Sequence, residues 1–308
     1  MPRLSIIIPL RSNLELFEAT LVSVLENRPD ECEVIVAHDG SYDDPFDLAG
    51  EVCFAVADDQ ALVNLVWAAT QIATSPVVHV LADGFLASED WTRAAVDAFD
   101  DEEVQCATPL ICDQESDHTI LAAGWTDDRL RLRRSIAEGA TAVGRLEQQR
   151  VRGVYFAASF WHIALLRKCL KSIAVDSAIE FEALFARWME EERKQIHILS
   201  ESRVFTSSQA PELQSVGYRE GFQLQCAAQS RGFAATAGFA LLACITRPHR
   251  VESWATAIGR LSAGLMGTKY RTMLDRNYES LAAAHRPNDE SNAQTLAFPT
   301  HQPLRQAA

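Results

Sequence analysis

Buried-strand patterns and amphipathic helical patterns alternate along the first third of this chain. The apolar runs cover residues 4–10, 32–41, 51–56 and 76–83, and helical periodicity covers 14–27, 61–73 and 88–100, the last opened by Ser88. Runs that stay apolar on both alternating positions are typical of strands buried on both faces. This order of elements indicates an α/β fold with a doubly wound, mostly parallel sheet flanked by helices.

Polar residues follow three of the expected strands. The strand ends read "PLRSN" from Pro9, "HDGS" around Asp39, and "ADG" around Asp83. In open parallel sheets the ligand crevice lies beyond the carboxyl ends of the strands, so these residues are expected to share one site. The sequence has neither a GxGxxG turn after the first strand nor a GxxxxGK[ST] loop, which argues against a dinucleotide fold and a P-loop.

Composition narrows the class of partner. The 308 residues are 48% apolar, and 42 acidic against 28 basic side chains give a net charge of −14. A binder of nucleic acid needs an excess of Lys and Arg to neutralise phosphates, so no nucleic-acid partner is expected. The seven cysteines are scattered without a CxxC pair, which is typical of reduced thiols in a cytoplasmic protein. The longest apolar run near the C-terminus, 233–245, is too short to span a bilayer.

Four motifs occur in a definite order in the first hundred residues. They are "LSIIIP" at 4–9, "HDGS" at 38–41, a helix containing Asn64, and "HVLADGFLASEDW" at 79–91, in which a tryptophan follows an acidic strand end. In this order and spacing they resemble the inverting glycosyltransferases of family 2, which have the GT-A fold. The resemblance covers residues 3–207 and is most specific in this first part.

The resemblance implies a site for a nucleotide-sugar donor. Asp39 matches the carboxylate that binds the nucleobase, and the backbone of Pro9, Leu10 and Arg11 would lie under the nucleotide. Asp83 matches an acid of the family's metal motif, so Mg²⁺ or Mn²⁺ is the expected ion. Gly40, Ser41 and Asn64 complete the expected donor site.

A general base is also implied by the resemblance. The family uses a carboxylate in a Glu-Asp motif, and the nearest text here is "SAIEFEALFARW", which offers Glu182 first and Glu180 second. In an inverting transfer such a carboxylate deprotonates the acceptor hydroxyl while a divalent ion stabilises the departing diphosphate.

Simpler interpretations of the same residues stay open. Asp39-Gly40 and Asp83-Gly84 are favoured turn pairs. Glu180 and Glu182 could be solvated acids at the start of a charged amphipathic helix. Gly84 stands where the family has its last metal-binding aspartate, and it carries no ligand atom. The alternative function is therefore a non-catalytic relative that binds nucleotide or nucleotide-sugar as a regulator or scaffold.

Three regions are expected along the chain. Residues 1–207 form the GT-A-like domain, 208–285 a helical extension, and 286–308 a polar tail expected to be disordered. Helical segments at 217–245 and 251–284 either pack on the first domain or form an interfacial surface for a lipid-linked acceptor, as in relatives that build cell-envelope polysaccharide. The expected location is cytoplasmic, with or without peripheral contact at the inner face of the membrane. Sugar, acceptor and oligomeric state are not specified.

Overall fold

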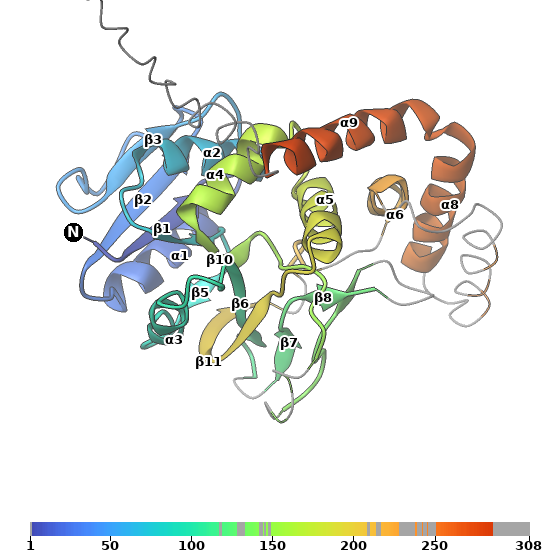
Figure 1. Ribbon diagram of the computed structural model, residues 1–308. Helices are drawn as coiled ribbons and strands as arrows, with labels where there is room; N and C mark the ends of the chain where they lie inside the picture. The colour runs from blue at the N-terminus through green and yellow to red at the C-terminus, as the bar shows by residue number, and fades with distance from the viewer. Residues whose placement is uncertain are drawn as a thin grey trace, which may run out of the picture.

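The fold is built on one curled sheet of nine strands, shown in Figure 1. The computed structural model describes residues 2–116, 119–127, 133–141, 144, 146, 149–207, 210–213, 217–227, 238, 242, 245 and 251–285. The strands of the sheet are β1 (Leu4–Pro9), β2 (Cys32–His38), β3 (Cys53–Val56), β4 (Val77–Leu81), β5 (Leu86–Ala87), β6 (Cys106–Asp113), β7 (Ile120–Ala122), β10 (Ala158–His162) and β11 (His197–Thr206). A separate pair is formed by β8 (Trp125–Thr126) and β9 (Arg134–Ser135).

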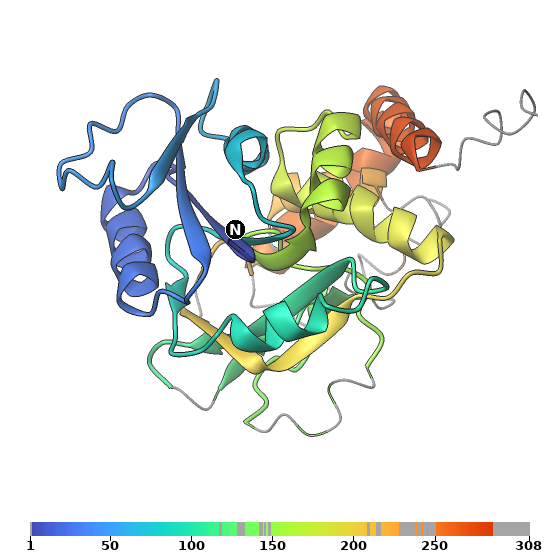
Figure 2. The ribbon, with the colours of Figure 1, turned by 60° about the vertical axis from the view of Figure 1, so that its left-hand side comes forward.

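Helices cover both faces of the sheet. They are α1 (Leu14–Glu26), α2 (Leu62–Ile72), α3 (Arg93–Ala98), α4 (Ile163–Ser172), α5 (Ala178–Glu191), α6 (Tyr218–Ala227), α8 (Val251–Met266) and α9 (Thr268–Ala284). Helix α1 packs on β1 and β5, whereas α2 packs on β1, β2 and β3. Figure 2 shows α1 and α2 on opposite sides of these strands. The expectation of a doubly wound sheet flanked by helices is therefore confirmed.

Strand β1 lies between β2 and β4, and both pairings are parallel. All six of its residues are buried, as its mostly apolar sequence predicts. The register places Pro9 beside Ala37 of β2 and Ile7 beside Val80 of β4, so the three strands end at one edge. Beyond β4 the sheet becomes mixed, because β10 runs antiparallel between β4 and β6.

A carboxylate holds the amino ends of these strands together. Glu33 at the start of β2 accepts hydrogen bonds from the Ser5 hydroxyl of β1 and from the backbone N–H groups of Thr74 (2.6 Å) and Ser75 (3.2 Å), just before β4. Burial alone would raise the pKa of Glu33, but these hydrogen bonds outweigh burial and lower the pKa. The network therefore fixes the register at the edge opposite the polar loops.

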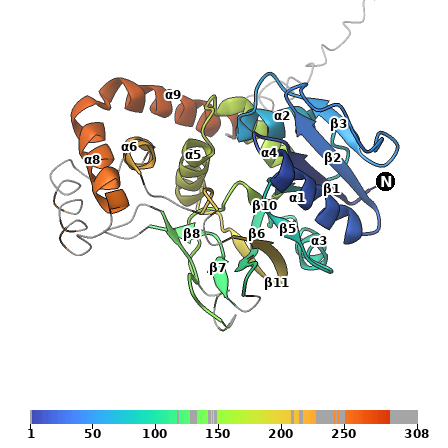
Figure 3. The same ribbon diagram turned by 180° about the vertical axis from the view of Figure 1, so that it is seen from behind.

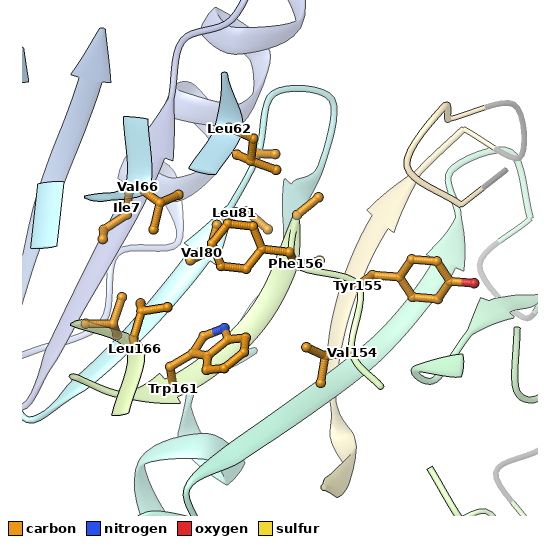
Figure 4. Packing of buried hydrophobic residues seen from close by; sticks show 14 of the residues in the cluster. Ile7, Leu62, Val66, Val80, Leu81, Val154, Tyr155, Phe156, Trp161 and Leu166 are labelled. Carbon is orange, nitrogen blue, oxygen red and sulfur yellow. The ribbon is translucent and has the colours of Figure 1, made fainter. Parts of the chain in front are cut away.

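The core is densest where β1, β4 and β10 meet α2 and α4. Figure 4 shows Ile7, Val66, Leu166 and Trp161 converging from these elements. Burying each such side chain contributes about 1.5–3 kcal/mol, which outweighs the local propensity of any one segment. Phe156 points into this cluster, whereas its neighbour Tyr155 points away from it (Figure 4).

The third helix starts later than the sequence predicts. Ser88 does not cap it: the Ser88 hydroxyl donates to the carbonyl of Arg203 on β11 (2.8 Å), and α3 begins at Arg93. Residues 86–87 instead form β5, which pairs antiparallel with β11. Asp90 takes a positive φ of 56° in the intervening turn, which a continuous helix from Ser88 would not allow.

The C-terminal helices pack against the sheet domain through α5 and α4. Helix α6 lies between α5 and α8, and α9 crosses above α5 (Figures 1 and 3). The expected single helix over 251–284 is divided at Gly267 into α8 and α9, and this part of the prediction is wrong. The segment 286–308, expected to be disordered, lies outside the described residues.

Two glycines allow α6 and α8 to touch backbone to backbone. A Cβ atom added at Gly259 of α8 would lie 2.1 Å from the carbonyl oxygen of Tyr218, and one added at Gly221 of α6 would lie 2.4 Å from that of Thr256. Both obstacles are backbone atoms of a neighbouring helix, so a side chain at either position forces the helices apart.

We expect Gly259→Ala to lower the free energy of unfolding by about 1–3 kcal/mol, because it overpacks this helix contact. Gly50→Ala is the matched control, since a Cβ atom there meets nothing within 4 Å. Urea unfolding measures both variants. Equal stabilities of Gly259→Ala and wild type would show that α6 and α8 do not pack this closely.

Candidate functional site

The polar residues predicted from the three strand ends do meet at one edge of the sheet. Arg11 follows β1, Asp39 follows β2 and Asp83 follows β4, and the parallel register brings these ends side by side. Asp39 and Asp83 thus lie at the same edge of the sheet, as the sequence predicts, but neither lines the pocket described below, so their sharing of one ligand site stays a prediction.

Asp39 forms the first turn beyond β2. Its Oδ1 atom accepts hydrogen bonds from the Ser41 backbone N–H (3.1 Å) and hydroxyl, while Oδ2 accepts one from Gln60 Nε2 (2.8 Å). These hydrogen bonds from Ser41 and Gln60 lower the pKa of Asp39, so the carboxylate is ionised at neutral pH. Gly40 has a φ of +89°, which explains why glycine stands at this point of the turn.

A pocket of about 440 Å³ opens beside this turn. Its lining comes from the loop after β1, the first residue of α1, the loop after β2 and the turn before α2: Leu10, Arg11, Ser12, Leu14, Ser41, Tyr42, Asp43, Pro45 and Gln60. Asp39 supports the pocket by binding two lining residues, Ser41 and Gln60. The buried hydroxyl of Tyr42 has no hydrogen-bond partner among the described residues.

Asn64 contacts the pocket only indirectly, through Asp59. Its side-chain amide donates to both carboxylate oxygens of Asp59, at 3.1 and 3.0 Å, and Asp59 accepts the backbone N–H of Ala61 (2.8 Å). These contacts fix the turn that presents Gln60 to the pocket. Asn64 is not among the residues that line it.

Arg11 joins the pocket to the end of β4. Its Nε atom donates to Asp83 Oδ1, and its Nη1 atom lies 2.6 Å from Glu212 Oε1. The side chains of Asp83 and Glu212 are only 4% and 11% exposed, whereas Arg11 is 26% exposed. Burial raises the pKa of Asp83, and the positive charge of Arg11 opposes this rise.

The contacts of Asp83 do not fit a resident divalent ion. One of its carboxylate oxygens is engaged by Arg11, and in the described part of the chain no three acidic, His or Cys side chains come together as metal ligands. Gly84 supplies no ligand atom. Its N–H donates to Thr20 Oγ1 (3.0 Å), and its carbonyl accepts from Thr206 Oγ1 (2.8 Å). These contacts argue against a metal ion at Asp83, which stays a prediction.

Gly84 has a φ of +89°, a conformation that costs an L side chain about 1–3 kcal/mol. We expect both Gly84→Ala and Gly84→Asp to lower the free energy of unfolding by about this amount. A Cβ atom there would meet only Leu16 at an ordinary contact of 3.5 Å, so the cost comes from the backbone. Thermal and urea unfolding measure it. A Gly84→Asp variant as stable as wild type, with tighter Mn²⁺ binding, would instead support the metal-motif interpretation.

The two expected base residues lie in buried contacts near the start of α5. Glu182 accepts the Phe156 backbone N–H (2.8 Å) and pairs with Arg133 Nη2 (2.7 Å), while Glu180 accepts hydrogen bonds from Gln223 Nε2 (2.6 Å) and the Tyr270 hydroxyl. Both carboxylates are 4% exposed. Neither lines the pocket described above.

Burial is the main influence on Glu182. It raises the pKa of this carboxyl from 4.5 to about 7, although Arg133 opposes the rise. Arg133 in turn lies over the ring of Tyr155 at 4.3 Å, and the Tyr155 hydroxyl contacts Ser135 Oγ at 2.6 Å. The Tyr155 side chain is fully buried, and in Figure 4 its hydroxyl points away from Phe156 and Val80.

The raised pKa of Glu182 predicts a pH-dependent stability. The pKa of Glu182 is higher in the folded protein than in the unfolded one. Its contribution to the free energy of unfolding is therefore greatest below pH 4.5 and is lost as the pH rises through 7. The loss is on the order of 3 kcal/mol. We therefore expect Glu182→Gln, which does not titrate, to be less costly at pH 8 than at pH 5 in urea unfolding. A substitution that costs more at pH 8 would mean that Arg133 holds Glu182 ionised.

Sequence reasoning missed two of the residues that shape the site. Gln60 could have been noticed, because it directly precedes the helix expected at 61–73. Glu212 had no signal, because it lies 201 positions after Arg11 in a segment between β11 and α6. Two tryptophans of this part of the chain belong to the core: Trp91 is fully buried, and Trp67 is partly buried against it.

Comparison with solved structures identifies the fold. The chain is similar to GalNAc-T7, solved with UDP, GalNAc and Mn²⁺, with a TM-score of 0.54 and 11% identity over 92% of this chain and 56% of that one. It is also similar to the mannosyltransferase PcManGT from Pyrobaculum calidifontis, in complex with GDP-Man and Mn²⁺, with a TM-score of 0.46 and 14% identity over 92% and 75% of the two chains. No protein-family model and no curated protein sequence matches the chain.

The chain therefore has the GT-A fold of nucleotide-sugar glycosyltransferases. At this identity the likeness establishes the fold alone, and the chain spans little more than half of GalNAc-T7. In the described residues, no helix is both long and apolar enough to cross a bilayer. Helix α8 exposes Ile258, Leu265 and Met266, and contact of the C-terminal helices with a membrane surface stays a prediction.

Proposed function

We propose that this chain binds a nucleotide-sugar in the pocket at the carboxyl edge of its sheet and transfers the sugar to an acceptor. The observation that carries the proposal is a pocket of about 440 Å³ in a GT-A fold, lined by Arg11 and Gln60, with Asp39 bound to Gln60 behind the lining. That volume suits a small-molecule site, which is typically a cleft of about 300–1,000 Å³ with a few convergent polar groups.

The polar groups suit the parts of such a donor. Asp39 is an ionised acceptor for the N–H groups of a nucleobase, and Tyr42 of the same loop lines the pocket. Backbone from Pro9 to Arg11, with Gly40 and Ser41, would surround the nucleoside. Arg11 carries the positive charge that the phosphates need.

The transfer step requires a base. Glu182 is the proposed base, because a pKa of about 7 suits proton abstraction near neutral pH, and Glu180 is the second choice. For catalysis the acceptor hydroxyl would have to come within hydrogen-bond distance of one of these carboxylates. An inverting outcome and membership of family 2 belong to this proposal, as do an envelope glycan as acceptor and a cytoplasmic location.

A second function has specific support. Glu182 and Glu180 are each 4% exposed and already hydrogen-bonded, and Gly84 supplies no second acid next to Asp83 in the sequence. A protein that binds the nucleotide-sugar without transferring it, as a regulator or scaffold, would retain the pocket and need no base. The two functions share the donor site and differ only in turnover.

A donor panel separates them. Wild type is screened for thermal stabilisation by nucleotide-sugars, with and without Mn²⁺, and each stabilising donor is then followed for release of the nucleoside diphosphate with a set of acceptors. Stabilisation with turnover supports the transferase, and stabilisation without turnover supports the binding protein. The absence of stabilisation by every donor would contradict both.

Asp39→Ala should weaken nucleotide binding roughly ten- to a hundredfold, the usual effect of removing a charged hydrogen-bond acceptor. The fold should survive, because Asp39 lies in a loop beyond β2. The control is Asp101→Ala, which removes an exposed aspartate from a similar turn, where it accepts the Glu103 backbone N–H (2.9 Å). Isothermal calorimetry measures both variants. Unchanged affinity in Asp39→Ala would remove this residue from the site.

A further inference from the structure

Among the described residues that line the pocket, Arg11 is the only basic one. Two carboxylates hold its guanidinium from different parts of the chain: Asp83, directly after β4, and Glu212, in the segment between β11 and α6. Because these two groups fix its orientation, the guanidinium is pre-organised to receive a ligand.

The guanidinium keeps donors for such a ligand. Of its five N–H groups, one binds Asp83 Oδ1 and one binds Glu212 Oε1, while Nη2 reaches the Asp83 carbonyl only at 3.4 Å. Its planar fork matches the paired oxygens of a phosphate better than a point charge would.

The same contacts leave little room for a metal ion at this place. A divalent ion at Asp83 would have to displace Arg11, which belongs to the same chain and lies only two residues beyond β1. Gly84 cannot carry a second acid without strain, given its φ of +89°. The positive charge that the ion would bring is already supplied by the chain.

We infer that Arg11 takes the place of a divalent ion in binding the phosphate groups of the donor, and that these phosphates displace Glu212 from the guanidinium. This inference rests on the proposed function and names the residue that meets the diphosphate. It makes donor binding independent of Mg²⁺ and Mn²⁺.

Charge balance explains the part played by Glu212. Asp83, Glu212 and Arg11 together carry a net charge of −1 when both acids are ionised, which by itself repels a diphosphate. When a phosphate replaces Glu212, the guanidinium remains paired with two anions, and Glu212 is released from Arg11. Glu212 therefore acts as an internal competitor, and the apparent affinity is reduced by the fraction of molecules in which it occupies Arg11.

The test measures binding of UDP, GDP, ADP, CDP and dTDP by calorimetry, once with EDTA and once with Mn²⁺. Wild type is expected to bind one of them with the same affinity in both buffers. Arg11→Gln should weaken that binding roughly ten- to a hundredfold, and Arg11→Lys should restore part of it. Glu212→Gln should tighten it roughly three- to tenfold, an effect that a purely structural role would not produce.

Arg3→Gln is the matched control. Arg3 precedes β1 at the opposite edge of the sheet and pairs with Asp100 at 2.7 Å in an exposed contact, so its loss should leave nucleotide affinity unchanged. Arg11→Gln leaves Asp83 without its partner and can fail to fold, in which case Arg11→Lys and Glu212→Gln decide the question.

The outcomes separate this inference from the proposed function. Binding with Mn²⁺ but not with EDTA would overturn the role of Arg11 and leave the proposed function standing. Equal or weaker binding by Glu212→Gln would overturn the displacement of Glu212. If no nucleoside diphosphate binds in either buffer, the proposed function falls, and this inference falls with it.

Discussion

The pairing of β1 between β2 and β4 determines where Arg11, Asp39 and Asp83 lie. All six of its residues are buried, and its register places Leu4 beside both Cys32 of β2 and Val77 of β4. Glu33 fixes the amino ends of these strands, so their carboxyl ends stop together. The loops that carry Arg11 and Asp39 then face one pocket as a consequence of strand geometry.

The buried carboxylates of this molecule lie in two places and have different kinds of partner. At the carboxyl edge, Asp83 is paired with an arginine that also reaches a pocket, so the pair can exchange partners with a ligand. Near α5, Glu182 is paired with Arg133 and a backbone N–H, and Glu180 is bound by residues of α6 and α9. The second pattern ties the C-terminal helices to the GT-A domain. A carboxylate so enclosed can serve as a base only if the acceptor reaches it.

The sequence predicts local order well and contacts distant in sequence poorly. The alternation of apolar runs and helical periodicity located the strand ends, so Asp39 and Asp83 could be placed at one edge before any coordinates. It could not reveal that Arg11 neutralises Asp83, because a charged pair leaves no periodic pattern. The helix start predicted at Ser88 was wrong for a related reason. The cap signal at Ser88 is local, whereas β5 pairs with β11, which lies more than a hundred positions away, and this pairing overrides the signal.

The most direct test of the central claim is a crystal structure of this chain with a bound nucleoside diphosphate, grown in EDTA. The account predicts the base against Asp39 and Gln60, the phosphates on the guanidinium of Arg11, and Glu212 displaced from it. A nucleotide bound elsewhere, or phosphates that leave the Arg11–Glu212 pair intact, would contradict it.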